Sequence, residues 1–401
     1  MTLRFHLAPG RERSLLRRHP WVFSGSVARS EGDPADALVE IVAADGRILG
    51  VGLASPGAGL VARVLAFGPD AVVDEALFDA RVAAAAALRA RVVGPDTTGY
   101  RVVHAEGDDL PGLVVDRYGD LLVVQVVTRA AETLRPLWLP ALVRHLAPGA
   151  ILQRNDLPPR RAEGLPLESE VLLGEPPGDL LTYAEHGIRA VADVGAGQKT
   201  GAFLDQRENR RRVAGLAAGR TVLDLYCHAG GFAVHALAGG ARRAVSVDSS
   251  ARALGLAAEA RRLNGLAAAP EDLVQADVPA DLRRRVAAGE RWDVVVLDPP
   301  PFARRRADLD AAARAYKDVN LQAMRLLAPG GVLFTCTCSA AVDADLFQKI
   351  VFGASVDAHV PLRLLERRGA GPDHPVSLDC PEGEYLRGLL CAREARSAVT
   401  P

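Results

Sequence analysis

The chain has 401 residues, of which 49% are hydrophobic and 24% are charged, and its formal net charge is −1. This length exceeds the size at which a single hydrophobic core usually divides, so it predicts two or three domains. The near-neutral charge excludes a uniformly basic nucleic-acid binder, but it leaves room for a local basic face.

Residues 1–74 are predicted to form a small β-rich unit. Residues 37–55 contain two strand-like runs around Ala-Asp-Gly, a sequence that favours a hairpin turn. Residues 60–67 supply a further strand. The N-terminal residues lack the apolar stretch of a signal peptide, and no apolar run reaches the roughly 18 residues that cross a bilayer.

Arginines are interleaved with aromatic residues near the start of this unit. Arg11, Arg17 and Arg18 precede Trp21 closely in the sequence. Guanidinium groups bind phosphates and aromatic rings stack on bases, so these residues are candidates for RNA binding. A solvated helix end whose Trp21 belongs to the core explains the same pattern equally well.

Residues 75–185 are predicted to form a second region that mixes helices and strands. Residues 74–93 are rich in alanine and favour a helix, as do residues 134–146. Residues 110–128 are typical of a hairpin around Arg-Tyr-Gly-Asp. The Pro- and Gly-rich stretches that follow predict loops.

From about residue 186 onward, short apolar strands alternate with helical segments, a pattern that predicts a parallel α/β sheet. The predicted strands are TVLDLY, AVSVD, LVQAD, DVVVLD and GVLFTC, which begin at residues 221, 244, 273, 293 and 331. Ligands of such sheets bind beyond the carboxyl ends of the strands.

Four of these five strands end in or close to an acid. The acids are Asp224, Asp248, Asp277 and Asp298. A carboxylate at a strand end needs a partner. A single acid in this place is usually a helix cap, whereas four in successive strands favour a ligand site.

The glycine turn after the first of these strands indicates which ligand is bound. Its candidate contacts are Tyr226, Ala229, Gly230 and Gly231. The turn reads Ala-Gly-Gly-Phe and departs from the G-x-G-x-x-G of dinucleotide sites, which disfavours NAD. A cofactor with ribose and adenine but no phosphate fits better, with Asp248 at its hydroxyls and Asp277 at its adenine amino group. Ser249 is a further candidate contact of this cofactor. These features describe S-adenosylmethionine.

The fourth strand continues into the sequence DPPPFARRR, which starts at Asp298. The prolines stiffen the loop and remove N–H donors, so Asp298 and carbonyl groups face a planar substrate that carries an amine. Phe302 could stack on a base, and Arg304 and Arg305 could hold phosphates. A rigid turn with solvated charges is the alternative. The loop suits methylation of a base amine as well as methylation of pyrimidine C5.

The five cysteines are odd in number and irregularly spaced, which favours free thiols in a reducing cytoplasm. Only Cys336 and Cys338 lie close together in the sequence. A zinc site would require a second such pair, so no metal site is predicted. If the last strand continues as far as residue 338, the two thiols share one face of it.

Over essentially its whole length the chain resembles bacterial ribosomal RNA 5-methylcytosine methyltransferases of the large-subunit, RlmI type. RSLLRRHPWVFSGSV looks like the opening of their PUA domain, and LPGLVVDRYGD looks like their middle domain. GQKTGAFLDQRENR is similar to the segment that precedes their Rossmann-like core and closes over the cofactor. The stretch from DPPPF to FTCTCS and the later DHPVSLDCPEGEYLRG complete the match.

The resemblance implies an α/β protein with three domains. These are a PUA RNA-binding domain at 1–74, an α+β middle domain at 75–185 and a class I methyltransferase domain at 186–401. It also implies that Phe203, Asp205 and Gln206 contact S-adenosylmethionine and that ribosomal RNA of the large subunit is the partner.

In this family Cys338 aligns with the nucleophile, which adds to cytosine C6, whereas Cys336 aligns with a position that need not be cysteine. Asp298 would accept a hydrogen bond from the cytosine N4 amine. Two alternatives stay open: an adenine- or guanine-amine methyltransferase with inert cysteines, and a non-catalytic RNA-binding or ribosome-assembly protein. A cytoplasmic location is expected, and a homodimer is compatible with the sequence.

Overall fold

The computed structural model describes residues 2–55, 59–156, 158–266, 269–303 and 305–395. The chain divides into two compact units that exchange segments. Unit 1 comprises Met1–Leu181, Asp193–Gly201 and Pro372–Gly383, and unit 2 comprises Thr182–Ala192, Ala202–Gly371 and Glu384–Pro401. The division into three domains at residues 74 and 185 stays a prediction.

Unit 1 begins with a six-stranded sheet in the order β2-β6-β5-β4-β1-β3. Its strands are β1 (Leu3–Leu7), β2 (Trp21–Phe23), β3 (Val27–Glu31), β4 (Leu38–Val42), β5 (Ile48–Ala54) and β6 (Leu60–Phe67), with the short helix α1 at Arg13–Leu16. The hairpin expected around Ala-Asp-Gly is confirmed, because β4 and β5 pair antiparallel. Alternate residues such as Val39 and Ile41 point into the core of this sheet.

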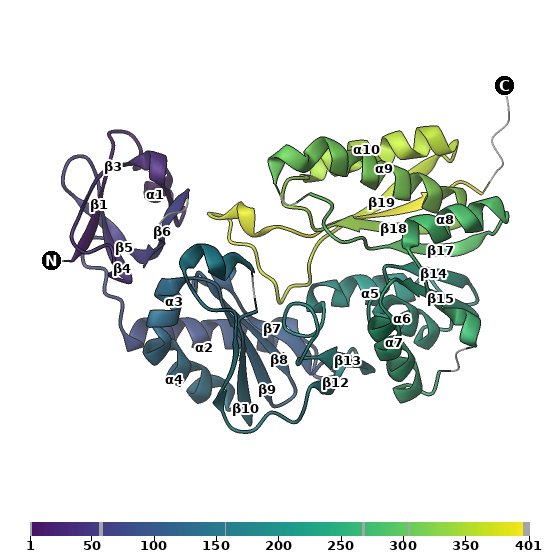
Figure 1. The fold of residues 1–401 in the computed structure, drawn as a ribbon, viewed down its shortest axis with the longest axis horizontal. Coiled ribbons are helices and arrows are strands. Elements are labelled where there is room, and N and C mark those ends of the chain that lie inside the picture. Colours follow the sequence, from purple (N-terminus) through teal and green to yellow (C-terminus); the bar gives the residue numbers. More distant parts are fainter. Residues whose placement is uncertain (1, 56–58, 157, 267–268, 304, 396–401) are drawn as a thin grey trace. The chain divides into compact units, whose positions relative to one another are not determined.

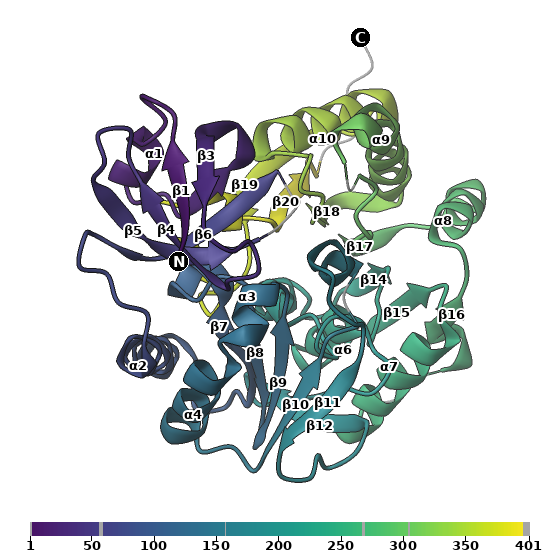
Figure 2. The same cartoon turned by 60° about the vertical axis from the view of Figure 1, so that its left-hand side comes forward.

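The second sheet of unit 1 has the order β11-β10-β9-β8-β7, which Figure 2 shows as neighbouring ribbons. Its strands are β7 (Gly99–His104), β8 (Leu113–Tyr118), β9 (Leu121–Val126), β10 (Ala150–Arg154) and β11 (Ser169–Leu173). Three helices, α2 (Glu75–Val92), α3 (Arg129–Thr133) and α4 (Arg135–Leu146), accompany it. Phe78 and Trp138 of α2 and α4 pack with Val115 and Val124 in one hydrophobic cluster.

Unit 2 is built on a seven-stranded sheet in the order β16-β15-β14-β17-β18-β20-β19. Its strands are β14 (Thr221–Leu225), β15 (Arg243–Asp248), β16 (Leu273–Gln275), β17 (Trp292–Leu297), β18 (Leu327–Thr337), β19 (Leu362–Arg368) and β20 (Arg387–Arg393). The five predicted strands are confirmed and pair in parallel. The sequence did not reveal β19 and β20. β20 extends the sheet antiparallel to β18, and β19 pairs antiparallel with β20.

Helices cover both faces of this sheet (Figure 1). They are α5 (Arg207–Ala214), α6 (Gly231–Ala238), α7 (Ala251–Leu263), α8 (Val278–Ala287), α9 (Leu309–Arg325) and α10 (Ala344–Ala358). Leu223 packs with α8, α9 and α10, whereas its neighbour Val222 packs with α5 and α6. Because helices cover both sides of β14, apolar residues occupy both of its faces.

The remaining elements are short. A two-stranded sheet pairs β12 (Leu180–Glu185) with β13 (Ile188–Asp193). The 3-10 helices are η1 (Ser24–Ser26), η2 (Ala105–Asp108), η3 (Pro158–Glu163), η4 (Leu204–Gln206), η5 (Pro270–Asp272), η6 (Arg306–Asp308) and η7 (Pro381–Gly383). Among the helices in the described part of the chain, none combines the length and apolarity that crossing a bilayer requires.

Candidate active site

The predicted acids gather at one edge of the sheet of unit 2. Leu225 of β14 pairs with Val247 of β15 and with Leu297 of β17, and Leu297 pairs in turn with Thr335 of β18. The residues that follow these positions therefore emerge side by side. This register brings Asp298 next to Cys336, although 37 residues separate the two in the sequence.

Asp224 is fully buried at the end of β14. Its Oδ2 accepts a hydrogen bond from the Ala233 N–H at 3.0 Å, and its Oδ1 has no hydrogen-bond partner among the described residues. Burial, with the nearby Asp298 carboxylate adding to it, raises the pKa of Asp224 to about 7. In the same part of the structure the buried hydroxyl of Tyr226 has no hydrogen-bond partner among the residues that the structure describes. Polar atoms left open in this way suit a site that receives the polar groups of a ligand.

The shifted pKa of Asp224 predicts how stability depends on pH. The native carboxyl keeps its proton up to about pH 7, whereas the unfolded chain releases it near the ordinary value of 3.8. The native state therefore binds more protons in this window, and stability falls as the pH rises through it. Asp224→Asn should make thermal unfolding less sensitive to pH between about pH 5 and about pH 8. The exposed Asp120→Asn is the control, and equal pH sensitivity of Asp224→Asn and wild type would contradict the prediction.

The two glycines of the turn have a packing role. Gly230 has a φ of +68° and is the N-cap residue of α6, and a Cβ there would lie 2.7 Å from the Ala257 Cβ of α7. A Cβ at Gly231 would lie 2.5 Å from Nε of Arg210 on α5. Side chains at these positions would therefore push α6 away from its neighbouring helices.

Asp248 and Asp277 both take part in local backbone hydrogen bonds. Asp248 accepts from the N–H groups of His228 and Ser250, each at 2.9 Å, which joins the glycine turn to the end of β15. Asp277 caps α8 by accepting from the Ala280 N–H at 3.0 Å. The helix-cap interpretation therefore holds for Asp277. Each carboxylate oxygen has a second lone pair that these contacts leave available to a ligand. Ser249, also predicted at the cofactor, is exposed.

Residues 202–210 of the segment that resembles the family's cofactor-closing segment belong to unit 2 and lie at the same strand ends. The Phe203 ring meets the His228 ring of the glycine turn edge-on, with centroids 4.9 Å apart. Asp205 is buried and accepts a hydrogen bond from the Tyr385 hydroxyl at 2.5 Å. Gln206 donates to Oδ2 of Asp298 at 3.0 Å. Unit 2 thus brings this segment together with the loops after β14 and β17.

The two thiols differ sharply in their surroundings. Cys336 lies within β18 and is fully buried, and its Sγ lies 2.9 Å from Oδ1 of Asp298. Burial, reinforced by the Asp298 carboxylate, raises the pKa of Cys336 well above its ordinary value, so this thiol stays protonated. Because β18 ends at Thr337, Cys338 stands on the turn beyond it and is half-buried.

A hydroxyl cluster that the sequence did not reveal holds the turn around Cys338. The buried Tyr316 hydroxyl lies 2.8 Å from Ser339 Oγ and accepts a hydrogen bond from Thr337 Oγ1 at 2.8 Å. Ser339 Oγ also accepts from the Ala303 N–H, at 3.2 Å. Both neighbours of Cys338 are therefore fixed, and one of them is tied to the loop after β17.

The predicted RNA-binding residues occupy different environments. Arg11, Arg17 and Arg18 are exposed, and the Arg18 guanidinium lies 5.0 Å from the centre of the Phe67 ring. Trp21 is half-buried and donates a hydrogen bond from Nε1 to Oε1 of Glu106 at 3.0 Å.

The loop after β17 carries the other predicted RNA contacts. Phe302 is half-buried against Tyr316, with ring centres 4.7 Å apart. Arg305 is exposed and lies 3.4 Å from the carboxylate of Asp308. Arg304 lies outside the described residues. The packing of Phe302 leaves less of its ring for a base than the sequence suggested.

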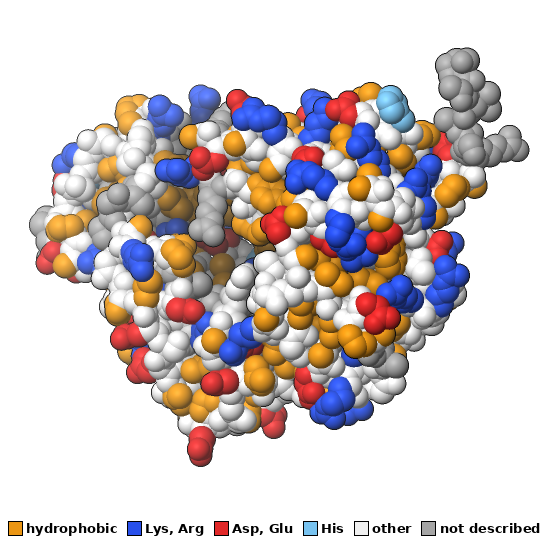
Figure 3. All heavy atoms as spheres, turned by 45° about the vertical axis from the view of Figure 1, so that its right-hand side comes forward, with side chains coloured by type: hydrophobic (Ala, Val, Ile, Leu, Met, Phe, Trp, Pro, Cys, Tyr) orange, Lys and Arg blue, Asp and Glu red, His pale blue; other side chains and the backbone are white. Residues whose placement is uncertain are grey.

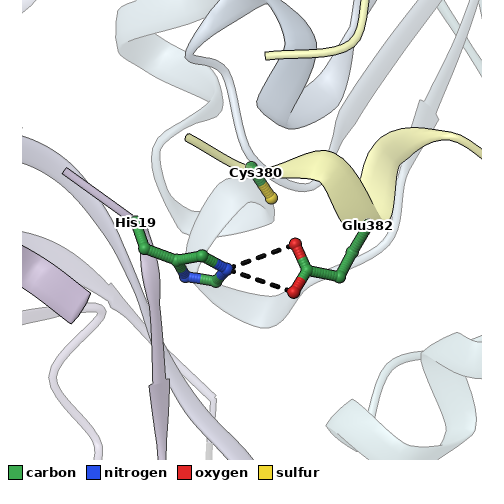
Figure 4. Close-up of side chains that lie close together, drawn as sticks. All are labelled: His19, Cys380 and Glu382. Carbon is green, nitrogen blue, oxygen red and sulfur yellow. Dashed lines mark hydrogen bonds and ion pairs between the residues drawn. The ribbon is translucent and has the colours of Figure 1, made fainter. Parts of the chain in front are cut away.

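Figure 4 shows a group in unit 1 with the composition of a metal site: His19, Cys380 and Glu382, whose donor atoms lie within 4.8 Å of one another. His19 Nε2 lies 3.2 Å from a Glu382 oxygen, while Nδ1 of the same ring accepts the Trp21 N–H. The neutral ring therefore carries its proton on Nε2, the atom that a metal would need. Burial, together with nearby carboxylates, raises the pKa of Cys380 to about 12. These facts describe a hydrogen-bonded contact and not a metal centre.

Comparison with known proteins places this geometry in a family. A model of S-adenosylmethionine-dependent methyltransferases matches residues 123–385, and a model of PUA-like domains matches residues 5–67. Proteins named ribosomal RNA large subunit methyltransferase I are similar over nearly their full length. That of Cronobacter sakazakii is 42% identical over 393 residues and covers 98% of this chain and 99% of its own. That of Klebsiella pneumoniae strain 342 is 42% identical over 390 residues, with 97% and 98% covered.

Solved structures agree on the fold. A candidate S-adenosylmethionine-dependent methyltransferase from Streptococcus mutans superposes with a TM-score of 0.84 at 22% identity, covering 98% of this chain and 100% of its own. A candidate methyltransferase solved with S-adenosylhomocysteine gives the same values. The open polar atoms of Asp224 and Tyr226 at the strand ends fit such a ligand. The chain therefore belongs to the S-adenosylmethionine-dependent methyltransferases with a PUA-like domain, in the family of the ribosomal RNA large subunit methyltransferases I, and its cofactor is S-adenosylmethionine.

Proposed function

We propose that the chain methylates cytosine C5 in ribosomal RNA of the large subunit through a covalent bond between Cys338 and C6 of the base. The observation that carries this proposal is the contrast between the two thiols. Cys338 is partly accessible on a fixed turn, whereas Cys336 is buried beside Asp298. The names of the relatives support ribosomal RNA as the substrate.

The reaction follows from the low nucleophilicity of cytosine C5. The Cys338 thiolate adds to C6, a C–S bond forms, and the electron pair of the C5–C6 double bond moves toward C5. When bound, S-adenosylmethionine supplies the electrophilic methyl group that C5 accepts. C5 then loses its proton, and departure of the Cys338 thiolate restores the double bond.

Other residues of the site hold the two substrates. Asp298 would accept a hydrogen bond from the cytosine N4 amine, which selects cytosine over uracil. Asp248 and Asp277 would take the ribose hydroxyls and the adenine amino group of the cofactor through their remaining lone pairs. The target base must leave its stack to reach Cys338.

The product decides between the proposal and its alternatives. Large-subunit ribosomal RNA is incubated with the protein and methyl-labelled S-adenosylmethionine, digested, and analysed by mass spectrometry for modified nucleosides. Label in 5-methylcytidine supports the proposal. Label in N6-methyladenosine or N2-methylguanosine would identify an amine methyltransferase, and absence of label with retained RNA binding would identify a binding or assembly protein.

The exposed arginines of the PUA-like domain are expected to contact phosphates. Figure 3 shows Lys and Arg interspersed with Asp and Glu, so the face that it draws carries no uniformly positive field. A double substitution of Arg11 and Arg17 by Ala should weaken RNA binding. The negative slope of log affinity against log salt concentration should become less steep by about one to two. Arg29→Ala, on β3 of the same sheet, is the control. Unchanged affinity and slope in the double variant would refute the assignment.

A further inference from the structure

The carboxylate of Asp298 is held at both of its oxygens by buried side chains. Cys336 Sγ lies 2.9 Å from Oδ1, and Gln206 Nε2 lies 3.0 Å from Oδ2. Gln206 Nε2 also lies 3.3 Å from Cys336 Sγ, so the three groups form one cluster. Cys336 is fully buried, and it therefore acts on a substrate only through Asp298.

A chain of hydrogen bonds fixes the orientation of Gln206. Arg368 donates from Nε to Oδ1 of Asn209 at 3.1 Å, and a guanidinium group can only donate. Asn209 Nδ2 must then donate, and it does so to the Gly369 carbonyl at 3.0 Å and to Gln206 Oε1 at 2.6 Å.

With its oxygen occupied, Gln206 turns its Nε2 toward Asp298. The Gln206 amide at the end of this series of hydrogen bonds must therefore donate to Asp298, because each amide group has only one orientation that satisfies its neighbours.

We propose that Cys336 is a positioning residue. It holds the Asp298 carboxylate in one plane beside the Cys338 turn, and the hydrogen bonds that run from Arg368 through Asn209 to Gln206 hold the carboxylate with it. The proposal rests on the proposed function, because it assigns Asp298 to the cytosine amine. Both buried partners donate to the carboxylate and thereby stabilise its ionised, accepting form. The raised pKa of the Cys336 thiol agrees with this role, since only the protonated thiol can donate.

Three substitutions test the proposal in the full chain. Cys336→Ala removes the donor and should lower kcat for RNA methylation about tenfold, the effect of losing one hydrogen bond to a charged group. Cys336→Ser keeps a donor and should restore most of the rate. The KM for S-adenosylmethionine should stay unchanged in both variants. Asn209→Ala releases Gln206 without touching Asp298 and should lower kcat by a similar factor.

A matched control separates positioning from packing. Cys391 on β20 is also buried, and it pairs with Leu333 of β18 in the same sheet. Cys391→Ala should lower the thermal stability about as much as Cys336→Ala but leave kcat unchanged. Full kcat in Cys336→Ala, or a Cys336→Ser variant as slow as Cys336→Ala, would overturn the proposal. If the wild-type protein makes no 5-methylcytidine, the proposed function fails first, so the two failures are distinguishable.

Discussion

Cys338→Ser is expected to lower methyl transfer to RNA by about 10³-fold or more, because loss of a covalent nucleophile removes the reaction path and not a single contact. A serine hydroxyl at this position is almost entirely protonated near neutral pH, whereas a thiol supplies reactive thiolate. The side chain is half-buried on a turn held through Thr337 and Ser339, so the substitution leaves the surrounding hydrogen bonds in place.

Two measurements distinguish loss of chemistry from loss of structure. Calorimetric titration with S-adenosylmethionine should give the same affinity for Cys338→Ser and wild type. RNA containing 5-fluorocytosine should form a stable covalent complex with the wild-type protein, because fluorine takes the place of the C5 proton whose loss releases the base. The variant should form no such complex. An active Cys338→Ser enzyme would exclude the nucleophile assignment and favour methylation of a base amine.

Asp116→Ala is expected to destabilise unit 1 by about 3–5 kcal/mol, the cost of leaving one partner of a buried ion pair without the other. Asp116 is fully buried and accepts from Arg101 at 2.7 and 2.9 Å and from Thr200 Oγ1 at 2.6 Å. Burial by itself would raise the pKa of this carboxyl, but the Arg101 guanidinium more than reverses the effect, and the net shift is downward. The variant would remove the buried carboxylate to which Nε and Nη2 of Arg101 donate.

Asp120→Ala is the matched control, because Asp120 lies in the same hairpin with 92% of its side chain exposed. Urea unfolding followed by tryptophan fluorescence reports mainly on unit 1, which contains Trp21 and Trp138, two of the three tryptophans. Only Asp116→Ala should move the midpoint by a large amount. Equal midpoints for the two variants would show that the buried pair contributes little.

The sequence revealed the features that depend on local pattern. The central strands β14 and β17 of unit 2 are mostly apolar and buried, which is why they could be recognised and why Asp224 and Asp298 could be placed at one edge. The family resemblance added Gln206 to this edge. Nothing local distinguishes β19, where exposed residues such as Leu364 and Leu365 give no regular alternation.

Features that depend on distant pairing could not be read from the chain. Tyr316 reaches Ser339 across 23 positions, and Asn209 receives Arg368 across 159. No spacing rule links such positions, because the sheet order decides which residues meet. Asp277 is the opposite case: its role as a cap is local, but a cap and a ligand residue look alike in a sequence.

The pairing of β18 with β20 sets the order in which parts of the protein can fold while the chain is being synthesised. β18 carries Cys336 and leads into Cys338. One edge of β18 pairs with β20, which follows Pro372–Gly383 in the sequence, a segment that belongs to unit 1. The segment Pro372–Gly383 contributes contacts within unit 1, since Asp373 accepts a hydrogen bond from the Arg101 N–H at 3.0 Å. A nascent chain that has been synthesised only as far as residue 371 would lack the last segment of each unit. Such long-range closure predicts slow, coupled folding in which β18 is among the last strands to be secured.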